Sequence, residues 1–131
     1  MKILSVDFGT KKIGLAFSTG YLAEPLMTLN FINHQKTAAA IAKIIQERQI
    51  NKVVMGVSEG KLKEKSQLLA QEIRKAVNVP VILYDETLTS VEARKKLKEA
   101  KKSWWKRKQQ EHEFAAAIIL QEYLDCHNNN C

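Results

Sequence analysis

Cysteine is scarce in this chain: only Cys126 and Cys131 occur among 131 residues, and both lie near the C-terminus. Neither is accompanied by a second pair at metal-site spacing, so we expect free thiols in a reducing cytosol. No apolar run has the length of a membrane span, and the short N-terminal run contains Asp7, unlike a signal peptide. Together these features predict a cytoplasmic protein with no membrane partner.

Acidic residues are also in the minority. The chain has 14 Asp and Glu against 21 Lys and Arg, and its formal net charge is +7. Such a balance favours a polyanionic partner, usually nucleic acid. At 131 residues with 45% apolar content, the chain can fill one core but is too short for two lobes. We expect residues 1–125 to form one domain and residues 126–131 a polar tail.

The order of predicted elements indicates an α/β fold. Residues 2–7, 12–19 and 26–32 are rich in strand-forming residues, with Gly9 at the first turn and a break at Glu24-Pro25. Alternating strands and helices imply parallel strands joined by right-handed crossovers. The pattern therefore predicts a mixed five-stranded sheet, a three-strand meander and then parallel strands, with helices on both faces. The later elements are expected at 35–49 (helix), 52–56 (strand), 62–77 (helix), 79–84 (strand), 90–100 (helix) and 111–125 (helix).

Acidic residues stand at the ends of two predicted strands. Asp7 ends the first, and Asp85 and Glu86 end the fifth. Ligands of open α/β sheets gather at the carboxyl ends of parallel strands, so these acids are expected at one edge. Close carboxylates repel, and a divalent cation removes that conflict; paired acids holding Mg²⁺ or Mn²⁺ suit phosphodiester cleavage. From the residues alone, Asp7 as a turn residue and Asp85-Glu86 at a helix N-terminus remain alternatives.

Four segments carry a resemblance to a known family. They are SVDFGTKKIGLA at residues 5–16, VVMG at 53–56, YDETLTSVEA at 84–93 and AAAIILQEYL at 115–124. In this order they resemble the motifs of the YqgF/RuvX family along nearly the whole chain. The resemblance implies an RNase H-like fold related to Holliday-junction resolvases. It also implies a nuclease, with maturation of the precursor of small-subunit ribosomal RNA in ribosome biogenesis as its role.

The resemblance assigns roles to particular residues. Asp7 matches the first catalytic acid of the family and Glu86 the second, and both would hold Mg²⁺ or Mn²⁺. The family's third acid has no counterpart, because its place is taken by His112. Imidazole can bind Mn²⁺ but suits Mg²⁺ poorly. His112 is therefore a third catalytic candidate as a Mn²⁺ ligand or a proton shuttle, and an inert histidine in a weakened enzyme is the alternative.

Basic residues near aromatic ones suggest where nucleic acid binds. Lys101, Lys102, Lys106 and Arg107 surround Trp104 just before the His112 segment. Such a mixture suits neutralisation of phosphates and stacking on bases. A buried tryptophan surrounded by solvated lysines is the alternative, because it would give the same sequence pattern. The turn after Asp7 adds two further candidates, Lys11 and Lys12.

Three functions compete at this point. The first is an endonuclease acting on structured RNA, with precursor ribosomal RNA as substrate; branched DNA is the alternative substrate. The second is a non-catalytic module that binds RNA or a ribosomal subunit. The third, suggested by the DFGT segment, is an actin-like ATPase or sugar kinase, which needs two lobes and is rejected on size. The sequence leaves a monomer and a homodimer equally open.

Overall fold

The computed structural model describes residues 1–9, 11–57, 60–85 and 111–129. Their strands form one five-stranded sheet in the order β3-β2-β1-β4-β5. The predicted helix at 90–100 lies outside these residues. The described elements are β1 (Ile3–Phe8), β2 (Lys12–Ser18), β3 (Glu24–Asn30), α1 (His34–Glu47), β4 (Lys52–Val57), α2 (Lys61–Ala76), β5 (Val81–Asp85) and α5 (Glu111–Asn129).

The strand directions confirm the predicted mixed sheet. β2 is antiparallel to both β1 and β3, whereas β4 is parallel to β1 and to β5. The carboxyl ends of β1, β4 and β5 therefore meet at one edge of the sheet, which we call the carboxyl edge. β3 has the direction of β1, because each is antiparallel to β2, so β3 ends there too. The described helices α1 and α2 start at this edge because they follow β3 and β4.

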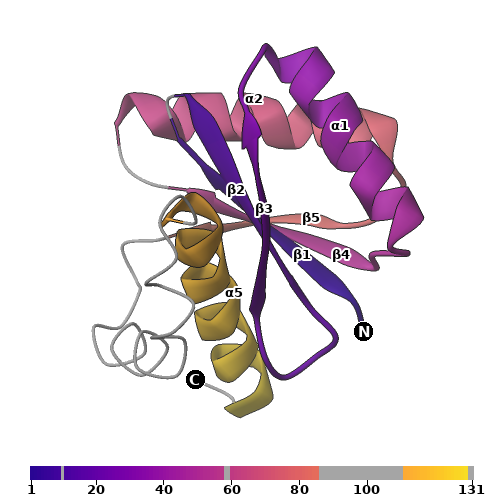
Figure 1. The fold of residues 1–131 in the computed structure, drawn as a ribbon, viewed down its shortest axis with the longest axis vertical. Coiled ribbons are helices and arrows are strands. Elements are labelled where there is room, and N and C mark those ends of the chain that lie inside the picture. The colour runs from indigo at the N-terminus through magenta and orange to yellow at the C-terminus, as the bar shows by residue number, and fades with distance from the viewer. Residues whose placement is uncertain (10, 58–59, 86–110, 130–131) are drawn as a thin grey trace.

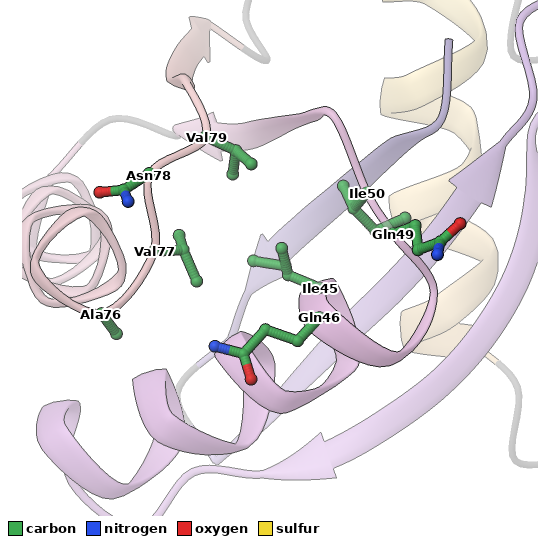
Figure 2. Close-up of a pocket in the computed structure, with 8 residues that line it drawn as sticks. All are labelled: Ile45, Gln46, Gln49, Ile50, Ala76, Val77, Asn78 and Val79. Carbon is green, nitrogen blue, oxygen red and sulfur yellow. The ribbon is translucent and has the colours of Figure 1, made fainter.

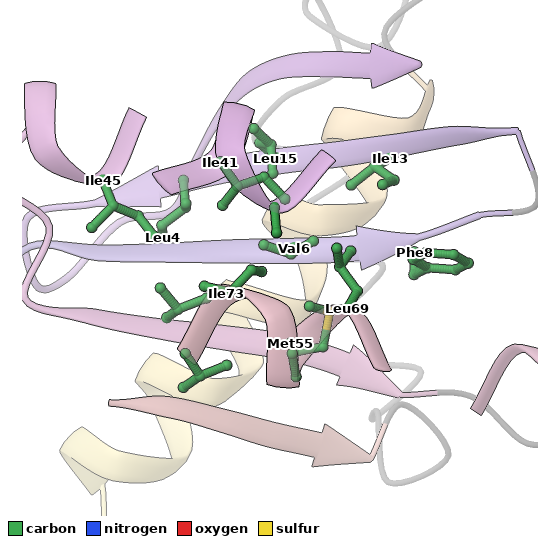
Figure 3. Close-up of a cluster of buried hydrophobic side chains, with 14 of the residues drawn as sticks. Leu4, Val6, Phe8, Ile13, Leu15, Ile41, Ile45, Met55, Leu69 and Ile73 are labelled. Atoms are coloured by element: carbon green, nitrogen blue, oxygen red, sulfur yellow. The ribbon is translucent and has the colours of Figure 1, made fainter. Parts of the chain in front are cut away.

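Helices cover both faces of the sheet, with α1 and α2 on one side and α5 on the other (Figure 1). Alternate residues of β1 separate the two cores. Leu4, Val6 and Phe8 belong to the apolar cluster under α1 and α2, part of which Figure 3 shows. Ile3 belongs to the cluster under α5, and the Ser5 hydroxyl donates to the Ala116 carbonyl of α5 at 2.7 Å. Asp7 follows the same alternation and lies on the α5 face.

Every described element differs from its predicted range by at least one residue, β1 for example ending at Phe8 rather than at Asp7, and two of these differences are informative. β3 begins at Glu24, so Pro25 lies inside a strand where the sequence indicated a break. β3 is an edge strand, and a register shift between Leu15 and Ala16 lies opposite Pro25; edges and bulges are the places where a sheet tolerates proline. At the other end of the chain, α5 continues to Asn129 rather than ending at residue 125. In the part of the chain described, no helix combines the length and hydropathy that crossing a bilayer requires.

The first turn of α5 lies directly on Gly14 of β2. A Cβ atom on Gly14 would be 1.9 Å from the His112 carbonyl oxygen and 2.8 Å from the Glu113 nitrogen. Only glycine allows two backbones to approach this closely. Gly14 is the cross-strand neighbour of Asp7 on β1. The contact therefore places the His112 backbone one strand away from Asp7.

Glu113 is buried in the same turn. Glu113 is 7% exposed. Burial raises the pKa of its carboxyl above the usual value, and the smaller effect of the Thr28 side chain lowers that pKa. Thr28 pairs with Gly14 from β3, on the opposite side from Asp7. The Glu113 carboxyl therefore lies toward the outer strand, about two strand spacings, roughly 10 Å, from the Asp7 position.

Replacing Gly14 by alanine tests the backbone contact. We expect Gly14→Ala to lower the free energy of unfolding by about 3 kcal/mol or more, because the methyl group meets rigid backbone rather than a flexible side chain. Chemical denaturation measures this loss. Gly20→Ala adds the same methyl group where no atom lies within 4 Å, and should cost less, through its φ of 143° alone. Equal losses in the two variants would show that α5 is not seated on Gly14.

The burial of Glu113 predicts a pH dependence of stability. Because the pKa is raised in the folded chain, the folded state holds this proton more tightly than the unfolded state. The stabilisation is full below the unfolded value of 4.5 and is lost as the pH rises through the folded value. We expect Glu113→Gln to gain stability relative to the native chain as the pH rises from about 4 to 7. Urea denaturation across this range, with the exposed Glu24→Gln as control, checks it; a difference independent of pH would contradict it.

Candidate active site

Asp7 lies in the middle of a row of five residues that crosses the sheet. The pairing register places Thr28, Gly14, Asp7, Gly56 and Tyr84 side by side on β3, β2, β1, β4 and β5. Both cross-strand neighbours of Asp7 are glycines, so neither brings a side chain to its flanks. Asp7 is half-buried and has glycine as its cross-strand neighbour on both sides.

The turn after Asp7 is tight and basic. The Gly9 amide donates to the Lys12 carbonyl at 2.9 Å, and a Cβ atom on Gly9 would lie 2.5 Å from that oxygen. Glycine is therefore required here by contact, as the predicted turn implied. Lys11 and Lys12 are exposed at this turn. Both predicted phosphate-contacting lysines consequently stand at the carboxyl edge, immediately after the Asp7 strand.

The second predicted acid follows directly on β5. That strand ends at Asp85, which is exposed and in register with Val57 of β4. Glu86 is the next residue in the chain and lies outside the described residues. So do the predicted basic residues Lys101, Lys102, Lys106 and Arg107, together with Trp104. Asp7 and the end of β5 do share one edge, as the sequence predicted.

His112 is half-buried at the start of α5, next to Gly14. The backbone of His112 lies on the α5 side of the sheet, the side to which Asp7 also belongs. The residue that the sequence analysis missed is Gly14. Its signal was a glycine inside an otherwise apolar strand, which often marks a close backbone approach.

Within residues 1–9, 11–57, 60–85 and 111–129, no three His, Cys, Asp or Glu side chains are grouped to hold an ion. The predicted pair needs Glu86, which lies beyond that range. Asp7 lies between two glycines, and β5 ends with Asp85 at the same edge. Carboxylate oxygens are the type of ligand that Mg²⁺ and Mn²⁺ prefer.

A groove of about 290 Å³ lies at the opposite edge of the sheet, between the ends of α1 and α2 (Figure 2). Its walls are aliphatic side chains with the amides of Gln46, Gln49 and Asn78. Among the described residues, no carboxylate or lysine lines it. The groove is thus unsuited to cations or phosphates and is separate from the Asp7 row.

Sequence comparison finds relatives along nearly the whole chain. A Chloroflexus aurantiacus protein is 36% identical over 136 residues, covering 98% of this chain and 89% of the relative. A Bacillus subtilis protein is 36% identical over 138 residues, covering 98% of this chain and 100% of the relative. Both bear the name "Putative pre-16S rRNA nuclease".

Structural comparison supports the RNase H-like fold that the motifs implied. T. thermophilus RuvC in complex with a Holliday junction substrate superposes with a TM-score of 0.67 at 15% identity, over 98% of this chain and 96% of that one. The fowlpox virus Holliday junction resolvase gives 0.63 at 14% identity, over 97% and 99%. At such identities the likeness concerns the fold. The model of the RuvX family, described as Holliday junction resolvase, matches residues 1–126, and this chain belongs to that family.

Proposed function

We propose that this chain is a cytoplasmic endonuclease that depends on a divalent cation and hydrolyses phosphodiester bonds in structured RNA, with precursor 16S ribosomal RNA as its substrate. The observation that carries the proposal is the position of Asp7, between two glycines at the edge where β5 ends with Asp85, the residue before Glu86 in the chain. The names of the relatives supply the substrate. The family and the fold of the resolvases support the reaction class.

The spacing of the strands suits a shared cation site. β4 separates β1 from β5, so the backbones of the Asp7 and Tyr84 strands are about 10 Å apart. Glu86 directly follows Asp85, the last residue of β5, in the chain. In this proposal the Asp7 and Glu86 carboxylates together hold the cations. Divalent cations bound between them would activate water and neutralise charge on the leaving oxygen.

The remaining residues would position the substrate and move protons. His112, held beside the Asp7 strand by the contact of α5 with Gly14, would accept or return a proton, since imidazole does so near neutral pH. Lys11 and Lys12 would neutralise phosphates next to the scissile bond. Lys101, Lys102, Trp104, Lys106 and Arg107 would extend that contact on the approach to α5.

Branched DNA is the second candidate substrate. The family description names a Holliday junction resolvase, and the similar RuvC structure contains a Holliday junction. RNA and DNA offer the same phosphates, so substrate choice depends on contacts beyond the backbone. Parallel cleavage assays on a precursor ribosomal RNA fragment and on a four-way DNA junction separate the two; preferential cutting of the junction would reassign the substrate.

Removal of the Asp7 charge tests the catalytic proposal. We expect Asp7→Asn to lower the rate of Mg²⁺- or Mn²⁺-dependent cleavage by more than about 100-fold, because even outer-shell changes at metal sites cost 10–100-fold. Gel assays of a precursor ribosomal RNA fragment, with and without chelator, measure it.

Asp125→Asn is the matched control, since Asp125 is exposed near the other end of α5 and should leave cleavage unchanged. A native chain that binds RNA tightly but leaves it intact in both metals would replace the nuclease with a binding module. Equal activity of Asp7→Asn and the native chain would refute the role of Asp7.

His112 allows a test of metal preference. We expect His112→Asp, which restores the acid of the family pattern, to raise Mg²⁺-supported cleavage about 10-fold while changing Mn²⁺-supported cleavage less, because carboxylate oxygen suits Mg²⁺ better than imidazole does. Cleavage rates in each metal across pH 6 to 9 provide the measurement. A loss of activity in both metals would mean that the imidazole itself transfers the proton.

A further inference from the structure

The loop between β3 and α1 presents an apolar side chain at the carboxyl edge. Ile32 is 66% exposed there. Its backbone is well anchored: the Ile32 amide donates to the Thr37 hydroxyl at 3.3 Å, and the Phe31 amide donates to the Lys11 carbonyl at 2.8 Å. The Asn33 side chain caps α1 by accepting from the Lys36 amide at 2.8 Å. The exposed side chain is thus held in place before any partner binds.

Aromatic packing joins this loop to the Asp7 strand. Phe31 packs against Phe8 with ring centroids 5.2 Å apart, and against His34 at the same distance. Phe8 is buried and directly follows Asp7. The loop therefore has a fixed relation to the candidate catalytic acid.

Positive charge predominates in the segments next to Ile32. Lys11, Lys12 and Lys36 are exposed at this end of the molecule. Between Asp7 and Glu47 the sequence contains a single acid, Glu24, at the start of β3 and so at the opposite edge. The N-terminus of α1 adds its partial positive charge here.

We propose that Lys11, Lys12, Ile32 and Lys36, together the Ile32 surface, bind the structured nucleic acid, with Ile32 packing on a base exposed where paired strands part. Apolar side chains commonly wedge against bases in this way, with lysines on the flanking phosphates. Lysine is depleted in the cores of protein–protein interfaces, so the charge favours nucleic acid over a protein partner. The proposal rests on the nucleic-acid substrate proposed above, but it requires no cleavage.

The test measures binding with cleavage blocked, using the full-length Asp7→Asn chain. The probes are a three-way-junction RNA with 2-aminopurine at its branch and a fully paired RNA duplex of the same length. Adding Ile32→Ser should weaken junction binding about 5-fold or more and leave duplex binding within about 2-fold, because stacking on an unpaired base is lost. Leu22→Ser, an apolar residue 50% exposed at the opposite edge, should change neither.

A separate pair of variants tests the contribution of the lysines. Lys36→Ala should weaken both probes and reduce the salt dependence of binding by about one ion, whereas Lys75→Ala, at the far end of α2, should not. Unchanged binding of both probes by Ile32→Ser overturns the proposal. If that variant instead abolishes self-association in sedimentation while binding RNA normally, the surface is a protein interface and the proposal is likewise overturned. Failure of cleavage alone would affect the proposed function and not this result.

Discussion

The close contact between the first turn of α5 and Gly14 is the constraint on which the rest of the structure depends. A Cβ atom there would be 1.9 Å from the His112 carbonyl oxygen, so the helix and β2 touch through backbone alone. Gly14 lies beside Asp7 in the pairing register. One glycine thus sets the separation between a helix that carries His112 and a strand that carries Asp7. Both residues are thereby brought to one face of the sheet.

The same edge gathers positive charge. The described helices α1, α2 and α5 all begin there, and their N-termini add to the exposed Lys11, Lys12 and Lys36. A carboxylate in such surroundings repels a phosphate substrate less than it would alone. The opposite edge carries the apolar groove, and basic residues such as Lys52, Arg74 and Lys75 lie at that end as well. The direction of the parallel strands, which brings Asp7 and the end of β5 together, therefore points to the carboxyl edge as the substrate side.

The sheet and the edge at which its acids meet could be predicted from the sequence, but the tertiary contacts around that edge could not. The apolar runs that stop at Asp7 and Asp85 predicted the two strand ends to within one residue, since β1 continues to Phe8 and β5 ends at Asp85, and parallel crossovers bring those ends together. The predicted start of β3 was wrong because Pro25 was taken as a break, whereas an irregular edge strand tolerates proline. Gly14 and Ile32 could not be assigned roles, since a backbone approach and the anchoring of a loop depend on residues distant in the chain. The burial of Glu113 against Thr28 is hidden for the same reason.

The most direct measurement is the location of Mn²⁺ by anomalous diffraction from soaked crystals of the full chain. The account predicts anomalous peaks at the carboxyl edge, with oxygens of Asp7 and Glu86 at about 2.0–2.2 Å, the range typical of a small divalent cation. Peaks elsewhere on the molecule, or an ion site that includes only one of these two carboxylates, would contradict the account.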